Sequence, residues 1–171
     1  PRTCRIIRPE EVSAIPKGTF NIVITENNYI KKLPVNDTIG AYKGDNPKHV
    51  MTVENTENVL LFSAQGKVFN LPVHKIPITE KGSVGIDIRV LLKGLISDIS
   101  AIVYEPILRE ASKKLEKHHI VMVTNNNCIK KLDIEDFLNV PLSGIIYTKL
   151  NPSDFVENIL IMPDNLDIVI Y

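Results

Sequence analysis

The sequence predicts an all-β fold made of propeller-like blades. One segment occurs twice, because Ile22–Leu33 returns as Val121–Leu132, at an offset of 99 residues. A second match joins Glu57–Phe62 to Glu157–Met162 in the same order. Around these matches, short β-branched and apolar runs alternate with Asn, Gly and Pro turn residues, which is typical of short antiparallel strands. An internal repeat of this kind indicates stacked supersecondary units.

The first repeat is predicted to hold two hairpins with a short strand between them. Asparagines 27 and 28 form the first turn, because Asn tolerates the positive φ that tight hairpins need. Gly66 serves the second turn for the same reason. The predicted strands are, in chain order, Phe20–Thr25, Tyr29–Leu33, Val50–Val53, Val59–Phe62, Lys67–Leu71, Gly85–Leu92 and Ile99–Tyr104.

One stretch between the repeats has helical character. Pro106 stands near a possible helix start, and the apolar residues after it recur on one face. We therefore expect one short linking helix at about 106–117. The predicted organisation is a lead-in (1–19), a first blade (20–104), a helical linker (105–118) and a partial second blade (119–171).

The two blades are expected to complete one another. A single small sheet leaves a face and its edges open, and stacked neighbours cover both. Propellers use about 4–8 blades, so two cannot close a ring. Either the chain is a fragment or its blades pack against something else. The second unit lacks a counterpart of Ile76–Tyr104, so strands near 86–104 are expected to pair with backbone from 119–171.

The composition excludes several classes of protein. The apolar fraction of 44% over 171 residues supports a packed core rather than disorder. No apolar run reaches about 18 residues, so neither a membrane span nor a signal peptide is expected. Cys4 and Cys128 lack metal-binding spacing, and two distant cysteines favour a reducing compartment.

Enzyme chemistry has no support in the residues. The four histidines show no ligand spacing, the serines lack a nucleophile elbow, and no glycine-rich loop leads from a strand into a helix. We therefore expect no catalytic residue, no metal and no cofactor in this chain.

The repeat places a lysine pair at the same point of each unit. These pairs are Lys31-Lys32 and Lys130-Lys131. If the blades stack, the pairs line one rim, and with Lys43 and Lys48 they could bind DNA phosphates without reading sequence. Residues 132–171 oppose this with one lysine against seven Asp and Glu. The alternative is that each pair only ends a solvated strand.

The ordered series of motifs resembles the C-terminal domain of the A subunit of bacterial type IIA topoisomerases, DNA gyrase and topoisomerase IV. The residues that carry the resemblance are Thr25, Asn27-Asn28, Lys31-Lys32, Leu60-Leu61-Phe62, Gly66, Lys67-Val68-Phe69, Ile76-Pro77, Gly85-Ile86, Leu91-Leu92 and Ile96–Val103. The resemblance covers roughly 20–104 and, as a partial blade, 119–171.

The resemblance implies a β-pinwheel whose neighbouring blades exchange strands and whose basic rim bends double-stranded DNA. It implies an accessory part of an ATP-dependent topoisomerase, whose partners are the rest of the A subunit plus the ATPase B subunit. It also implies a cytoplasmic, nucleoid-associated location and no membrane. The catalytic tyrosine of such enzymes lies in a breakage-reunion region that this chain lacks.

One departure concerns the gyrase box, Q-R-R-G-G-K-G. Counting from the first lysine pair, the box falls on Ala41–Pro47, which keeps one basic residue and one glycine. The departure fits topoisomerase IV, a divergent or phage-like subunit, or a chain separated from its box-bearing blade. A different class of function also stays open, a β-repeat scaffold that binds protein and has no role with DNA.

Overall fold

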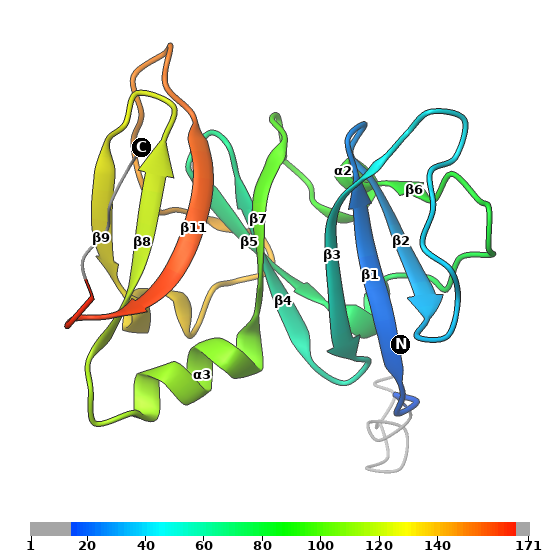
Figure 1. Ribbon diagram of the computed structural model, residues 1–171, viewed down its shortest axis with the longest axis horizontal. Helices are drawn as coiled ribbons and strands as arrows, with labels where there is room; N and C mark the ends of the chain where they lie inside the picture. The colour runs from blue at the N-terminus through cyan, green and yellow to red at the C-terminus, as the bar shows by residue number, and fades with distance from the viewer. Residues whose placement is uncertain (1–14, 167–171) are drawn as a thin grey trace, which may run out of the picture.

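The computed structural model describes residues 15–166, which form three antiparallel sheets placed side by side (Figure 1). The strand orders are β3-β1-β2-β6 in the first sheet, β10-β5-β4-β7 in the second and β11-β8-β9 in the third. The strands are β1 (Thr19–Thr25), β2 (Tyr29–Pro34), β3 (Pro47–Glu54), β4 (Asn58–Ser63), β5 (Lys67–Pro72), β6 (Ile86–Asp87), β7 (Ile99–Tyr104), β8 (His118–Thr124), β9 (Ile129–Asp133), β10 (Ile145–Ile146) and β11 (Val156–Pro163). The helices are η1 (Val73–Lys75), α2 (Ile88–Leu91), α3 (Glu105–Lys113) and η2 (Ile134–Phe137). The predicted all-β, blade-like class is confirmed, with three sheets in place of the two units read from the sequence.

Each sheet is built on the same core of three strands. A hairpin (β1–β2, β4–β5 or β8–β9) pairs through its first strand with a later strand (β3, β7 or β11). Each of these later pairings carries a register shift at the same place, next to the hairpin turn. The turn residues with positive φ are Asn28 (63°), Gly66 (88°) and Asn127 (58°). Residues 15–166 therefore contain three copies of one unit.

The strand pairing shows that the second sequence match does not join equivalent strands. The segment 57–62 lies almost entirely in β4, the first strand of a hairpin, whereas 157–162 belongs to β11, which pairs with β8. The structural counterpart of β11 is β3, because both strands follow a hairpin, pair with its first strand and carry the shift. The two segments match in sequence because a polar pair precedes an apolar run in both.

Neighbouring units exchange short strands. From the second unit, β6 crosses to the first sheet and pairs with β2; from the third, β10 crosses to the second sheet and pairs with β5. The segment 20–104 thus contributes strands to two sheets. The prediction that strands near 86–104 pair with 119–171 is wrong, because β7 pairs with β4 and the link is made by β10 instead.

A glycine precedes each exchanged strand and permits its close approach. Gly85 and Gly144 have φ values of 89° and 78°. A Cβ on Gly85 would lie 2.6 Å from the carbonyl oxygen of Ile30, and one on Gly144 would lie 2.7 Å from that of Val68. Only a residue without a side chain fits both the conformation and the space.

The strand predicted over Gly85–Leu92 is wrong beyond its first residues. Only Ile86–Asp87 is extended, and the chain then turns into the single helical turn of α2. The Asp87 side chain accepts a hydrogen bond from the backbone N–H of Arg89, which caps this turn. The linking helix lies where the apolar periodicity placed it, since α3 begins at Glu105, and it ends at Lys113 rather than near 117.

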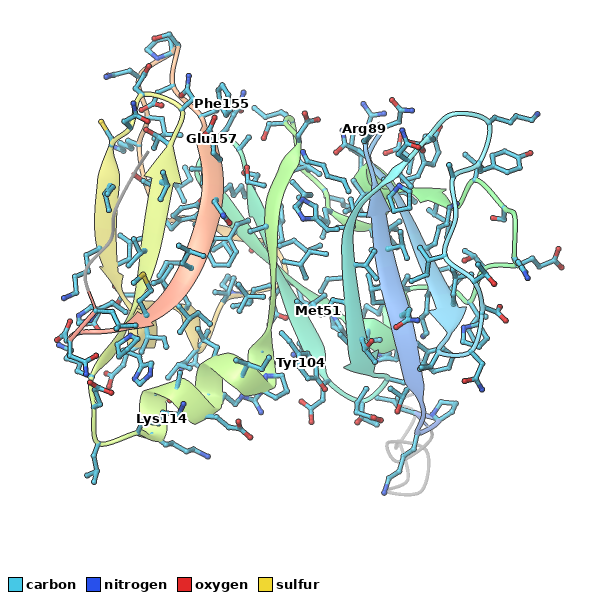
Figure 2. The ribbon with its side chains drawn as sticks, in the orientation of Figure 1. Met51, Arg89, Tyr104, Lys114, Phe155 and Glu157 are labelled. Carbon is cyan, nitrogen blue, oxygen red and sulfur yellow. The ribbon has the colours of Figure 1, made fainter. Side chains whose placement is uncertain are left out.

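The second sheet is buried on both faces. Val59 and Leu61 of β4 pack toward the first sheet, while Leu60 and Phe62 of the same strand pack toward the third. Figure 2 shows Met51 and Tyr104 in the space between the first two sheets, where both pack against the shared core. The Tyr104 hydroxyl also accepts a hydrogen bond from the Glu54 backbone N–H. None of the described helices is long and apolar enough to cross a membrane.

The exchange of strands predicts that a side chain at Gly144 destabilises the protein. Gly144→Ala should destabilise the chain by about 1–3 kcal/mol, because a side chain there meets the Val68 carbonyl and a strained φ. Gly40→Ala is the matched control, since Gly40 has no atom within 4 Å of its added Cβ. The measurement is the urea midpoint of each variant. Equal midpoints would contradict the structural role of the exchanged strand.

Candidate nucleic-acid interface

The two lysine pairs occupy the same register in their hairpins. Ile22 faces Lys32 across β1–β2, as Val121 faces Lys131 across β8–β9. The first members, Lys31 and Lys130, likewise face Val23 and Met122. The positional equivalence read from the sequence is therefore confirmed for these two hairpins.

The two pairs lie in different environments. The first pair was expected to be exposed on a rim, and this expectation is wrong. Only 5% of Lys31 and 3% of Lys32 is accessible to solvent. Both lysines therefore lie inside the protein and are poorly placed to reach a phosphate.

Lys32 is held by hydrogen bonds between the first two units. Its Nζ donates to Asn55 Oδ1 at 2.5 Å and to the Val73 carbonyl oxygen at 3.2 Å, and lies 4.8 Å from the centre of the Phe20 ring. Burial lowers the pKa of the Lys32 ammonium. Asn55 in turn donates to the Pro16 carbonyl oxygen at 2.7 Å. Lys32 thus ties β2 to the β3–β4 turn.

Lys31 points to the opposite face of β2. Its stem packs against Gly85, where an added Cβ would lie 2.8 Å from Lys31 Cγ. Its Nζ lies 6.0 Å from the centre of the Tyr42 ring. The loop that contains Tyr42 therefore shields this lysine from solvent.

The second pair is exposed but unequal. The Lys130 ammonium donates to Thr148 Oγ1 at 3.3 Å and has no carboxylate partner within residues 15–166. Lys131 forms an ion pair with Asp164, whose Oδ1 also lies 2.8 Å from His119 Nδ1. The lysine lowers the pKa of the Asp164 carboxyl. Lys130 is consequently the member with an uncompensated positive charge.

Lys43 and Lys48 are both exposed but have different neighbours. Lys43 has a φ of 49° in a tight turn in which the Tyr42 and Asp45 backbones bond to one another. Lys48 lies on β3 and lines a hollow that Asp98 and Glu157 also line. These carboxylates weaken any attraction of Lys48 for an anion.

Two further lysines, which were not predicted as DNA contacts, lie near Lys130. Lys67 begins β5, and Lys149 follows Thr148, the residue that binds Lys130. They line one hollow with no Asp or Glu among its lining residues. Recognition of β4–β5 as a copy of the repeated hairpin would have pointed to Lys67, but Gly66 and Phe69-Asn70 replace the asparagine turn and the lysine pair there.

A family model described as the DNA gyrase C-terminal domain, beta-propeller, matches residues 22–37, 57–89 and 118–161. These segments make up more than half of the chain. This chain belongs to the DNA gyrase C-terminal domain family. Of the six hairpin strands, only residues 19–21 of β1 lie outside the matched segments, and both exchanged strands lie inside them.

Relatives of known name agree with this assignment. The DNA gyrase A subunit of Leptospira biflexa is 24% identical over 95% of this chain, and the probable chloroplastic/mitochondrial counterpart of Oryza sativa is 28% identical over 85%. The chain spans only 22% and 16% of those two proteins. It is therefore comparable with a part of a gyrase A subunit, not with the whole.

Solved structures show the same fold. The C-terminal domain of DNA topoisomerase IV superposes with a TM-score of 0.67 at 15% identity, covering 86% of this chain and 46% of that one. The DNA gyrase A C-terminal domain gives a TM-score of 0.58 at 20% identity, covering 85% and 48%. The three sheets of this gyrase-family chain thus correspond to about half of each solved domain.

The buried lysine predicts a stability effect. Lys32→Ala should destabilise this gyrase-family chain by about 1–3 kcal/mol, because Asn55 Oδ1 and the Val73 carbonyl lose their donor. Lys130→Ala removes an exposed lysine from another hairpin and should change stability by less than about 0.5 kcal/mol. Chemical unfolding of both variants gives the comparison. If Lys32→Ala were no less stable than Lys130→Ala, the buried hydrogen bonds would contribute nothing to stability.

Proposed function

We propose that this chain is a DNA-binding, wrapping accessory domain of a type IIA topoisomerase A subunit, of the gyrase or topoisomerase IV kind. The observation that carries the proposal is membership of the DNA gyrase C-terminal domain family. In this proposal the domain guides duplex DNA for ATP-dependent strand passage and performs no cleavage itself. Its partners are the ATPase B subunit of the enzyme plus the remaining domains of the A subunit, in the cytoplasm at the nucleoid.

The proposed DNA contacts differ from those expected from the sequence. The exposed lysines 43, 48, 130 and 131 remain candidates, and Lys149 joins them because it lies beside the Lys130–Thr148 contact. Lys31 and Lys32 are not proposed as direct contacts, because both are buried. Such contacts are electrostatic, so binding should not depend on sequence and should weaken with salt.

The edge of β9 supports a place within a larger ring. In the first two sheets, the second hairpin strand is covered by β6 or β10 from the following unit. Within residues 15–166, no strand covers the far side of β9. A following unit of the parent protein would supply that strand, since an open edge otherwise exposes unpaired backbone groups.

The rim lysines give the direct test of function. Lys130→Ala combined with Lys149→Ala should weaken binding to unrelated duplexes equally and reduce the salt slope by roughly 0.9 for each phosphate that is no longer neutralised. Lys113→Ala with Lys114→Ala removes the same charge near the end of α3, outside the cavity wall that holds Lys149, and is the control. Gel shifts at two salt concentrations measure both pairs.

Three outcomes decide the proposal. A larger loss of affinity for the 130/149 pair supports the rim contacts. Equal losses would mean that only net charge matters and would remove the assigned positions. No binding by the unchanged chain at low salt would favour the β-repeat scaffold for protein interaction.

The ion pair at Lys131 predicts an opposite effect. Asp164→Asn removes the carboxylate that neutralises Lys131, so duplex affinity should rise and the salt slope should steepen. Glu110→Gln makes the same change of net charge on α3 and is the control. Fluorescence anisotropy with a labelled duplex measures both variants. A rise no greater than that of the control would show that Asp164 does not mask the lysine.

A further inference from the structure

A cavity of about 400 Å³ opens beside the tip of the β4–β5 hairpin. Its walls come from three stretches of chain, the hairpin itself, the loop after α2, and β10 with the residues that follow it. The lining residues used below are Gln65, Lys67, Leu95, Ile96, Ile146 and Lys149. The exchange of β10 between units therefore creates this cavity, and it would be absent from an isolated hairpin.

The cavity carries positive charge without a counter-charge. Two lysines line it, and no Asp or Glu does. Within residues 15–166, neither Lys67 nor Lys149 lies within ion-pair distance of a carboxylate. The third lysine nearby, Lys130, reaches the cavity wall through Thr148 Oγ1. An anion is thus the ligand that the electrostatics favour.

The Lys67 ammonium is held in place before any ligand arrives. Its Nζ lies 4.8 Å from the centre of the Phe69 ring. An added Cβ on Gly94 would lie 3.3 Å from this Nζ, and one on Gly144 would lie 3.0 Å from Lys67 Cε. The side chain is therefore confined between two backbone segments and an aromatic face. A confined ammonium loses less freedom on binding than one on an open surface.

The rest of the wall is apolar and open to solvent. Ile96 is 81% exposed and Ile146 is 68% exposed, and Leu95 and Leu150 lie with them along the cavity. Ligand sites of about 300–1,000 Å³ typically combine apolar walls with a few polar groups. At the small end of that range, the cavity has room for one compact ligand that carries both an anion and an apolar group.

We propose that this cavity binds a single unpaired nucleotide, with its phosphate at Lys67 and its base against the wall formed by Leu95, Ile96 and Ile146. Gln65 supplies an amide for the sugar or the base edge. The nucleotide comes either free or from the unpaired end of a DNA strand. This activity is separate from duplex binding and does not depend on it.

The test uses the full chain and titration calorimetry with four probes: inorganic phosphate, thymidine monophosphate, a blunt duplex, and the same duplex with a single-stranded overhang. Lys67→Met should weaken nucleotide binding about tenfold or more, and so should Ile96→Asp, because each removes one half of the site. Lys113→Met, on α3, is the control and should leave it unchanged. Blunt-duplex affinity should fall no more in the two cavity variants than in Lys113→Met, which makes the same change of net charge. If the unchanged chain prefers the overhang duplex to the blunt duplex and both cavity variants lose this preference, the nucleotide comes from the unpaired end of a DNA strand.

Four results would overturn the proposal. The first is no nucleotide binding by the unchanged chain, and the second is phosphate that binds as tightly as the nucleotide. The third is unchanged nucleotide affinity in Ile96→Asp. The fourth is a loss of blunt-duplex affinity in Lys67→Met that equals its loss of nucleotide affinity. The last result would make Lys67 a duplex contact. Because Ile96 is mostly exposed, its variant should fold normally and remains informative if Lys67→Met is unstable.

Discussion

The fold depends on a two-residue strand that crosses from the second unit to the first sheet, and on another that crosses from the third unit to the second sheet. A three-stranded sheet built from a hairpin and one later strand leaves the outer edge of the hairpin open. The strands β6 and β10 cover β2 and β5, and each begins after a glycine whose conformation and packing exclude a side chain. As a result the second sheet has a covered edge as well as two buried faces. The units stabilise one another, and none is a complete domain by itself.

Much of this fold could be predicted from the sequence, and the parts that could not share a cause. The hairpins at 22–33 and 121–132 were predictable because their asparagine turns and β-branched strands are local features. The β4–β5 hairpin was predicted as well, but its equivalence to the other two was missed, because Gly66 replaces the asparagine and the lysine pair is missing. The exchange of strands was missed because β6 and β10 are two residues long, too short to show alternation. Their destination depends on backbone packing at Gly85 and Gly144, which no periodicity reveals.

The candidate site was predictable in position and not in environment. The sequence places lysines at equivalent points of two hairpins, and it does so correctly. It says nothing of what covers them. The first hairpin packs against the second sheet and lies under the loop that contains Tyr42, so Lys31 and Lys32 are buried, while the third hairpin has an uncovered outer edge within the described residues. Burial is a property of the neighbouring units, and it decides which lysine can meet a ligand.

The second lysine of each pair makes a contact at the same place in its unit, but with a different type of partner. In the first unit, Lys32 lies over Phe20 and bonds to Asn55, the residue after β3. In the third unit, Lys131 bonds to Asp164, the residue after β11, and His119 takes the place of Phe20. The contact thus ties a hairpin to the turn after its partner strand in both units. It removes one charge from the surface of the first unit through burial and neutralises one in the third through pairing. The repetition of the lysine pair is therefore explained first by a structural contact that fixes the hairpin. Among the described residues, Lys130 is the one member of the two pairs whose charge is both exposed and uncompensated.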